Sequence, residues 1–391
     1  MIKVLHISKY YYPFIGGVEQ VARDIVLAMK DMGNVEQKLI CFNEDSAVGD
    51  NVTHKKETVT DTVDGIEVVR CGCFAKIASQ SLSFTYAGEL KKLIDNFDPD
   101  IVLLHYPNPF VTQLLLAHKK KRFKLAVWWH LDITRQKILR KFFHFQNIDM
   151  IKRADKIIGA TEKHVNESAY TKYFGDKKHV LPFAISEDRL ILSEEDEKKA
   201  QELREKHKDK LLCFFLGRHV PYKGLEYLIK ASAYLDDRFH FIIAGSGPLT
   251  EELKEMAKND SKIEFVGRVV DGERLSYLKA CDVFCFPSIT RNEAFGLALA
   301  EGLYFGKPAV TFTIKGSGVN VVSLNGITGI ECPNCDSKAY AEALKKLADD
   351  PSLREEYGRN GRQRILDNFT KEKFSENIKK LTEELIGSDT P

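Results

Sequence analysis

The chain has 391 residues, of which 43% are hydrophobic and 29% are charged. This length exceeds what one hydrophobic core organises, so we expect two domains, and the composition excludes a disordered or collagen-like chain. The net charge of +2 gives no general case for binding nucleic acid.

No apolar run approaches the roughly 20 residues that a membrane-spanning helix needs. The start of the chain, from Met1 to Ser8, is typical of a strand and has neither the basic region nor the cleavage site of an export signal. We therefore expect a cytoplasmic protein that is neither secreted nor membrane-spanning. Its eight cysteines should then be reduced thiols.

Short apolar runs, rich in β-branched and aromatic residues, alternate with helical segments in the first half of the chain. This alternation is typical of a parallel sheet covered by helices. The predicted strands are 4–7, 39–42, 66–69, 101–104, 125–129 and 156–160. Between the first two strands, apolar residues recur at helical spacing from Val18 to Met29, and Gly33 is placed to end that helix, so the first unit is β-α-β.

A charged stretch from Ser186 to Lys210 has no wide apolar face and is predicted to be a linker or an exposed connecting helix. The alternation of strands and helices then resumes. The predicted strands of the second half are 211–216, 239–244, 263–266, 283–286 and 309–312. A final amphipathic helix carries one apolar stripe, made of Phe374, Ile378, Leu381 and Leu385. We therefore expect domains at 1–186 and 187–370, followed by a helix at 371–391.

Open α/β sheets bind ligands at the carboxyl ends of their strands, so we expect the chemistry in a cleft between the two domains. The first strand leads through a tyrosine-rich loop to Gly16-Gly17 at a helix start. Paired glycines there let an anionic group approach backbone N–H donors. A plain turn is the alternative interpretation.

In the second half, Arg218 and Lys223 leave the end of the strand 211–216 on one loop. The next strand ends in the turn Gly245-Ser246-Gly247-Pro248. Two fixed cations beside an open backbone edge suit a diphosphate, because Arg offers a planar fork and Lys a point charge. The alternative is that both cations are ordinary solvated surface residues.

The segment after the strand 283–286 carries two carboxylates, Glu293 and Glu301. If both lie on one helix they are about 12 Å apart along its axis, with Glu293 at the positive N-terminus. This span suits a nucleotide sugar, with one carboxylate at the sugar and the other at the ribose. An N-terminal Glu and a solvated helix Glu would look the same in sequence.

The chain resembles the retaining glycosyltransferases of family 4 over nearly its whole length. The motifs that carry the resemblance are Gly16-Gly17-Val18-Glu19, Trp129-His130-Leu131-Asp132, Gly217-Arg218 with Lys223-Gly224, Gly245-Ser246-Gly247-Pro248, and the Glu-x7-Glu pattern of Glu293 and Glu301. The resemblance implies the GT-B fold, an α/β architecture of two facing Rossmann-like domains with parallel sheets and a C-terminal helix that returns to the first domain.

The resemblance also implies roles for single residues. Arg218 and Lys223 correspond to a diphosphate clamp, Glu293 to a contact with the donor sugar and Glu301 to a contact with the ribose. His130 resembles a histidine that lies near the anomeric carbon, although this chain has His-Leu-Asp where many members have His-Asp. The expected catalytic residues are His130, Arg218, Lys223 and Glu293, and the expected donor-binding residues are Gly16, Gly17, Gly247, Ala294, Phe295, Gly296 and Glu301.

Within the family, the tyrosine-rich loop and the Arg-x-Glu-Ala-Phe-Gly string look most like bacterial O-antigen and polysaccharide mannosyltransferases. This implies a retaining hexosyltransferase that needs neither a metal nor a cofactor. Its donor would be a nucleotide-diphosphate sugar, with GDP-mannose favoured and a UDP-sugar as the alternative. Its acceptor would be a glycan or lipid-linked glycan of bacterial surface polysaccharide synthesis. A transferase using UDP-glucose, UDP-galactose or UDP-GlcNAc and a sugar-nucleotide epimerase are the other readings within this fold.

Other classes of protein fit the sequence less well. A two-lobed solute-binding protein would need an export signal, and a dinucleotide dehydrogenase would need a Gly-x-Gly-x-x-Gly turn. The Asp-x-Asp of Asp98 and Asp100 precedes its strand and is interpreted as a turn. Cys332 and Cys335 have the spacing of half a zinc site, but Cys71 and Cys73 are far away in sequence and have the wrong gap, so a coincidence in a loop is favoured.

Basic residues gather on both sides of the strand 125–129. Those before it are Lys119, Lys120, Lys121, Arg122 and Lys124, and those after it are Arg135, Lys137, Arg140 and Lys141. The second group interleaves with Ile138, Leu139, Phe142, Phe143 and Phe145. This mixture predicts a helix that lies on an anionic membrane surface, so the protein would be peripheral on the inner face of the cell membrane. A core face with solvated charges is the alternative.

Overall fold

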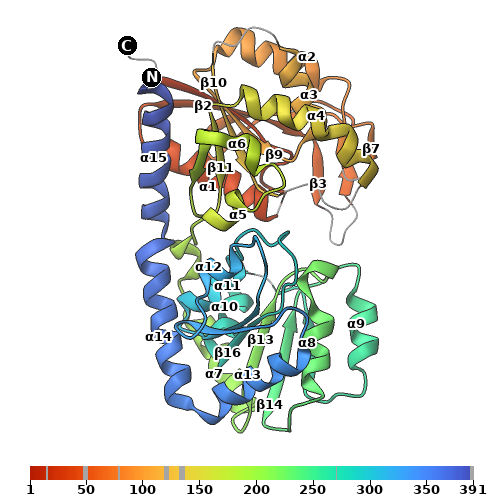
Figure 1. Ribbon diagram of the computed structural model, residues 1–391, viewed down its shortest axis with the longest axis vertical. Helices are drawn as coiled ribbons and strands as arrows, with labels where there is room; N and C mark the ends of the chain where they lie inside the picture. Colours follow the sequence, from red (N-terminus) through yellow and green to blue (C-terminus); the bar gives the residue numbers. More distant parts are fainter. Residues whose placement is uncertain are drawn as a thin grey trace. The chain divides into compact units, whose positions relative to one another are not determined.

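The structure, a computed structural model, describes residues 1–14, 16–46, 52–77, 80–118, 123–131, 137–269 and 271–387. The chain divides into two compact units, each with its own sheet and covering helices (Figure 1). Unit 1 contains Met1–Pro182 and the chain from Phe374 onward, and unit 2 contains Phe183–Lys373.

The unit boundaries fall four residues before the expected end of the first domain and three residues after the expected start of the last helix. Aromatic packing explains the first difference. The Phe183 ring lies 5.5 Å from the Phe295 ring, and the Ile185 N–H donates to the Phe369 carbonyl at 2.9 Å. Residues 183–186 are therefore held by unit 2.

Unit 1 is built on an eight-stranded sheet of order β12-β11-β10-β9-β1-β2-β6-β5, parallel except for β5. Its strands are β1 (Ile2–Ile7), β2 (Val35–Phe42), β5 (Val59–Val63), β6 (Ile66–Cys71), β9 (Ile101–Tyr106), β10 (Lys124–Trp129), β11 (Lys156–Gly159) and β12 (Lys178–Val180). Two small antiparallel pairs add β3 (Glu44–Ser46) with β4 (Val52–His54) and β7 (Ala75–Ile77) with β8 (Gln80–Leu82). Every residue of β9 is buried, as expected for a central parallel strand covered on both faces.

The helices of unit 1 cover this sheet. They are α1 (Gly17–Asp31), α2 (Tyr86–Lys92) continued by a π-helical turn (Leu93–Phe97), α3 (Pro109–Ala117), α4 (Lys137–Arg153), α5 (Glu162–Asn166), α6 (Thr171–Phe174) with a 3-10 turn (Gly175–Lys177), and α15 (Lys371–Gly387). The predicted apolar stripe of α15 is buried, and its Phe374 ring lies 6.3 Å from the Trp128 ring of β10. The C-terminal helix thus returns to unit 1, as the resemblance implies.

Unit 2 is built on a fully parallel six-stranded sheet of order β15-β14-β13-β16-β17-β18. Its strands are β13 (Leu211–Leu216), β14 (Phe239–Ala244), β15 (Ile263–Gly267), β16 (Val283–Phe286), β17 (Ala309–Phe312) and β18 (Gly329–Cys332). Its helices are α7 (Glu194–Lys206), α8 (Leu225–Ser232), α9 (Thr250–Ala257), α10 (Asp271–Ala280), α11 (Leu297–Tyr304), α12 (Val319–Val322), α13 (Ser337–Asp349) and α14 (Pro351–Asn368), with 3-10 turns at Glu187–Leu190 and Pro221–Lys223.

The sequence predicts either a linker or an exposed connecting helix in the charged stretch before β13. The structure shows the helix, α7. A capping box begins it, in which the Ser193 hydroxyl accepts from the Asp196 N–H and the Asp196 carboxylate accepts from the Ser193 N–H. Arg204 binds Asp282 at 2.7 Å, just before β16. Ala200 is the one apolar residue of this helix that is fully buried, so polar contacts contribute to holding it.

Candidate active site

The strand order of unit 2 reverses between β13 and β16, and the loops after these two strands carry most of the predicted site residues of this unit. Crevices at such reversal points, outside the carboxyl ends of parallel strands, are where open α/β sheets bind ligands. Arg218 and Lys223 follow β13, whereas Glu293 follows β16. The topology therefore brings together residues that lie about seventy positions apart in the chain.

Lys223 and Glu293 form an ion pair through Nζ and Oε2. Both side chains are largely buried, with 10% and 13% of their surface exposed. The Ser288 hydroxyl donates to the same carboxylate oxygen at 3.2 Å, and the Lys223 ammonium lies 4.7 Å from the centre of the Phe286 ring. Each charge is thus held in one position by several contacts, which leaves little to reorganise when a ligand binds.

Gly224 allows the two loops to approach each other. Its φ of +62° lies in the left-handed region, and a Cβ at this position would lie 2.3 Å from the Pro287 carbonyl oxygen. The Ile289 N–H also donates to the Tyr222 carbonyl at 2.9 Å. The glycine that follows the lysine is therefore required to seat the loop after β13 against the loop after β16.

Glu293 does not lie on the helix that carries Glu301, contrary to our expectation. The helix α11 begins at Leu297, and Gly296 precedes it with a φ of +93°, a conformation that no helix residue adopts. Glu293 instead lies in a turn, where its N–H donates to the Thr290 carbonyl at 3.1 Å. The separation of about 12 Å that was expected for Glu293 and Glu301 on one helix therefore does not apply.

Glu301 lies on α11 and accepts a hydrogen bond from Arg274 Nη1 of α10 at 2.5 Å. Both side chains are about five-sixths buried. Sequence reasoning missed Arg274, because nothing in its spacing links α10 to α11. In unit 2, Glu293 and Glu301 are thus each paired with a cation.

Among the remaining predicted donor-binding residues, Phe295 is part of the core. Its ring packs 5.5 Å from Phe183 and 5.3 Å from Phe369, and only 2% of its surface is exposed. The Ala294 carbonyl accepts from the Gly318 N–H at 3.0 Å. A Cβ at Gly247 would lie 2.4 Å from the His219 carbonyl oxygen, so close packing alone accounts for this glycine.

Gly16 and Gly17 lie at the start of α1, after the loop that follows β1. Gly16 is the N-cap of the helix in an extended conformation, and a Cβ at Gly17 would meet no atom within 4 Å. No neighbour in the described structure therefore requires a glycine at position 17. The tyrosines before it serve the fold, since Tyr11 donates to Asp64 at 2.9 Å and the Tyr12 ring lies under Arg23.

His130 follows β10 and is almost completely buried. Its Nε2 lies 3.0 Å from Nδ1 of His105, which is on the neighbouring strand β9. Burial lowers the pKa of His130 to about 3, so the imidazole is neutral at physiological pH. Sequence reasoning missed His105, although both histidines occur at the carboxyl ends of predicted neighbouring strands, and that position could have revealed the pair.

The other sequence-based interpretations are settled in part. Asp100 accepts from the Lys3 N–H at 2.8 Å at the amino end of its strand, as a structural turn residue would. Cys332 is buried and Cys335 is exposed, and both are free thiols.

The basic segment that was expected to contact a membrane is described only in part. Residues 119–122 and Arg135 lie outside the described residues, as do the side chains of Lys137, Arg140 and Lys141. Among the described residues, no helix has the length and hydropathy of a membrane span.

Two family models match the chain, one on each half. Residues 15–189 match the model described as Glycosyltransferase Family 4, and residues 195–364 match the model described as Glycosyl transferases group 1. The O-antigen chain mannosyltransferase C of Escherichia coli is 29% identical over 94% of this chain and 95% of its own length. The D-rhamnosyltransferase WbpZ of Pseudomonas aeruginosa is 27% identical over 94% of this chain and 92% of its own length.

Solved structures share the fold over the whole chain. Sucrose-phosphate synthase from Thermosynechococcus elongatus superposes with a TM-score of 0.78 at 16% identity, with full coverage of both chains. Anabaena HepE in complex with UDP and glucose gives a TM-score of 0.76 at 17% identity, covering 98% of this chain and all of that one. The predicted GT-B fold is confirmed, and the chain belongs to the family 4 glycosyltransferases, with bacterial O-antigen and polysaccharide transferases among its relatives.

Proposed function

We propose that the protein is a retaining, metal-independent hexosyltransferase that takes its sugar from a nucleotide-diphosphate donor. The observation that carries this proposal is the buried Lys223–Glu293 pair at the reversal point of the unit 2 sheet. The fixed ammonium of Lys223 can bind the diphosphate, and the fixed carboxylate of Glu293 can accept hydrogen bonds from the sugar hydroxyls. The pair would therefore contact the groups on both sides of the bond that breaks.

The diphosphate would be held by Arg218 and Lys223 after β13. As the bond from the anomeric carbon to the phosphate oxygen breaks, negative charge grows on the departing diphosphate and positive charge grows on the sugar ring. Cations already in place stabilise this state more than the ground state, and losing one such donor costs about 10²–10³ in rate. Two cations on one loop supply this stabilisation without a metal ion.

Glu293 would accept hydroxyl hydrogen bonds from the donor sugar, and Glu301 would accept them from the ribose. We propose His130 as a hydrogen-bonding group for the sugar near the anomeric carbon. A neutral imidazole suits this role, because an imidazolium would oppose the positive charge that develops on the ring. The open space beside Gly17 at the start of α1 suits the approach of a phosphate group.

Mannose from GDP-mannose is the donor we favour, because the O-antigen chain mannosyltransferase C matches nearly the whole chain. WbpZ is named as a D-rhamnosyltransferase, and HepE was solved with UDP and glucose. A deoxyhexose donor and a UDP-sugar donor are therefore the alternatives to test. We propose a glycan or lipid-linked glycan of bacterial surface polysaccharide as the acceptor, acted on in the cytoplasm at the inner face of the membrane.

Contact with an anionic membrane is part of this proposal. The end of the basic and aromatic segment lies on α4, where 73% of the Phe145 surface is exposed although Met150 and Ile151 of the same helix are buried. An exposed aromatic residue beside a basic segment favours binding to anionic lipid. Co-sedimentation with anionic vesicles at low salt, and release at high salt, would support it, whereas protein that stays in the supernatant would favour a soluble acceptor.

The direct test incubates the protein with a panel of GDP- and UDP-sugars in the presence of EDTA and measures released nucleoside diphosphate. We expect release from one donor, with GDP-mannose the first candidate, and retention of the anomeric configuration in a transferred product followed by NMR. Loss of turnover with EDTA that manganese restores would refute metal independence. Conversion of the donor to an epimeric sugar nucleotide, without transfer, would favour the epimerase.

A further inference from the structure

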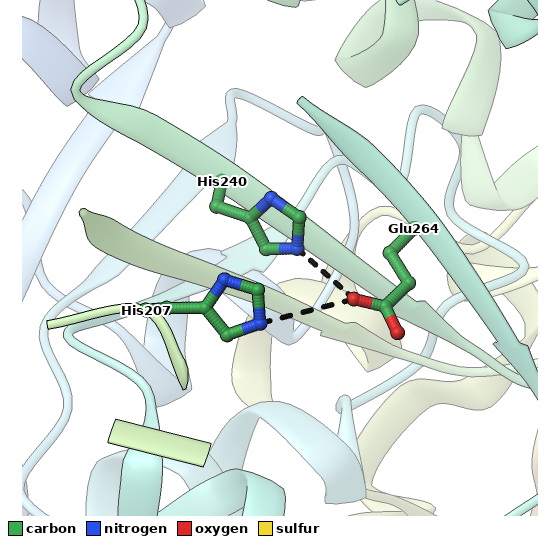
Figure 2. Close-up of side chains that lie close together, drawn as sticks. All are labelled: His207, His240 and Glu264. Carbon is green, nitrogen blue, oxygen red and sulfur yellow. Dashed lines mark hydrogen bonds and ion pairs between the residues drawn. The ribbon is translucent and has the colours of Figure 1, made fainter. Parts of the chain in front are cut away.

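Three side chains with metal-ligating atoms converge at the opposite end of the unit 2 sheet from the site described above. His240 is the second residue of β14, Glu264 is the second residue of β15, and His207 directly follows α7. Both strands therefore contribute near their amino ends, whereas Arg218, Lys223 and Glu293 lie at the carboxyl ends. Figure 2 shows the two imidazoles pointing toward the Glu264 carboxylate from different elements.

The separations of the ligating atoms are close to those of a metal site. His240 Nε2 lies 3.1 Å and His207 Nε2 lies 3.9 Å from the same Glu264 oxygen, Oε2, and one ligand atom of each residue lies within 4.8 Å of the others. Tetrahedral zinc with bonds of about 2.0–2.2 Å requires ligand atoms roughly 3.3 Å apart. Small side-chain rotations would bring all three onto one ion.

His207 provides an independent reason to expect a ligand. Only 9% of its surface is exposed, and its Nε2 has no hydrogen-bond partner among the described residues. The Glu264 carboxylate oxygen, at 3.9 Å, is too far away for a hydrogen bond. A buried polar atom without a partner is destabilising, and a metal ion between His207 and Glu264 would satisfy it.

The site is also open to solvent on one side. The Glu264 side chain is 37% exposed, which leaves room for an ion to enter and for water to take a fourth position. Lys206 competes for the carboxylate, with Nζ 3.3 Å and 3.4 Å from its two oxygens. The Lys206 side chain is 58% exposed, and such exposed pairs are weak, so a metal ion can displace the ammonium.

We propose that His207, His240 and Glu264 form a zinc site that joins the end of α7 to the edge strand β15 and its neighbour β14. Two imidazoles and one carboxylate suit zinc better than calcium or magnesium, because those two ions prefer ligand sets made of oxygen atoms. The bound ion stabilises unit 2 where the end of α7 meets the sheet. This proposal does not depend on the glycosyltransferase activity of the protein.

The test uses the full chain, freed of metal with a chelator and then titrated with ZnCl₂ by calorimetry. The exposed Cys335 is changed to Ser in every sample, so that no surface thiol competes for the ion. We expect one Zn²⁺ per chain and a melting temperature that rises with free Zn²⁺. His240→Gln and Glu264→Gln should each weaken binding by more than the roughly tenfold to hundredfold that loss of an outer-shell partner typically costs, and the matched control His179→Gln, which removes a histidine 3.9 Å from a glutamate in unit 1, should not weaken it.

Lys206→Ala gives a second test that removes no ligand. Because the competing ammonium is gone, we expect this variant to bind Zn²⁺ several-fold more tightly while it folds normally by circular dichroism. The proposal is overturned if the chain takes up no Zn²⁺, if His240→Gln and Glu264→Gln bind it as tightly as the parent, or if Lys206→Ala binds it more weakly. Nucleoside diphosphate binding should be the same with and without Zn²⁺, because the two sites are at opposite ends of the sheet.

Discussion

The two Rossmann-like units present different chemistry at the carboxyl ends of their strands. In unit 2, charged side chains meet in pairs, Lys223 with Glu293 and Arg274 with Glu301. In unit 1, the corresponding end of the sheet carries the buried histidines His105 and His130, which burial keeps neutral. We infer that unit 2 recognises the charged diphosphate and the hydroxyls, whereas unit 1 contributes hydrogen bonds without charge.

Glu293→Ala should have the largest effect, a loss of about two orders of magnitude or more in turnover, because it removes an acceptor at the donor sugar. It also leaves the largely buried Lys223 without its partner carboxylate. Steady-state kinetics with the preferred donor measures the loss. Glu293→Gln keeps the shape of the side chain and should fold normally, so it separates the loss of the carboxylate from a folding defect. Ser288→Ala, which removes one neighbour of the same carboxylate, should lose far less.

Glu301→Ala should raise the donor KM by about tenfold to a hundredfold while it leaves kcat nearly unchanged. A ribose contact exists equally in the ground state and the transition state, so its loss weakens binding and not the chemical step. The exposed Glu355→Ala on α14 is a matched control that should behave like the wild type. If Glu301 controlled kcat and Glu293 only KM, the assignment of the two carboxylates would be reversed.

His105→Phe tests unit 1. The substitution keeps an aromatic ring beside His130 but removes the 3.0 Å hydrogen bond that holds its imidazole. We expect kcat to fall by about tenfold, the worth of one hydrogen bond, at an unchanged donor KM. His105→Gln can restore a hydrogen bond to His130 and should recover part of the loss. Equal losses in both variants would show that His105 is needed only for packing.

The buried histidines of unit 1 also predict sensitivity to acid. Burial lowers the pKa of His6 and His164 to about 4, from an ordinary value of 6.5. The unfolded chain therefore takes up protons first, so the free energy of unfolding should fall as pH drops from about 6.5 toward 4 and should not be affected by these groups above pH 7. Calorimetric melting at pH 7.5, 6 and 5 measures this dependence. It should be shallower in His164→Gln than in the control His118→Gln.

Much of the fold could be predicted from the sequence because buried parallel strands are nearly continuous apolar runs. The strands β13, β14, β16 and β17 have the expected bounds, and α1 follows its apolar spacing up to the turn at Gly33. The strands that were missed lack this pattern. β5 is an edge strand with four exposed residues, and β12 has only three residues, of which two are exposed.

The site could be predicted less completely, because spacing along the chain says little about contacts between elements. The motifs identified Lys223 and Glu293, and the structure pairs them. Arg274 and His105 come from other elements and gave no motif. The position of Glu293 was wrong because Gly296 takes a left-handed conformation, which delays the start of the helix.

We infer that the cations of unit 2 carry most of the recognition of the diphosphate. This inference is tested most directly by calorimetric titration of GDP and UDP into the wild type, Arg218→Ala, Lys223→Gln and His130→Ala. We predict that one nucleoside diphosphate binds the wild type, that each cation variant weakens this binding by about tenfold or more, and that His130→Ala leaves it unchanged. Binding that survives both cation variants and is lost in His130→Ala would show instead that unit 1 holds the diphosphate.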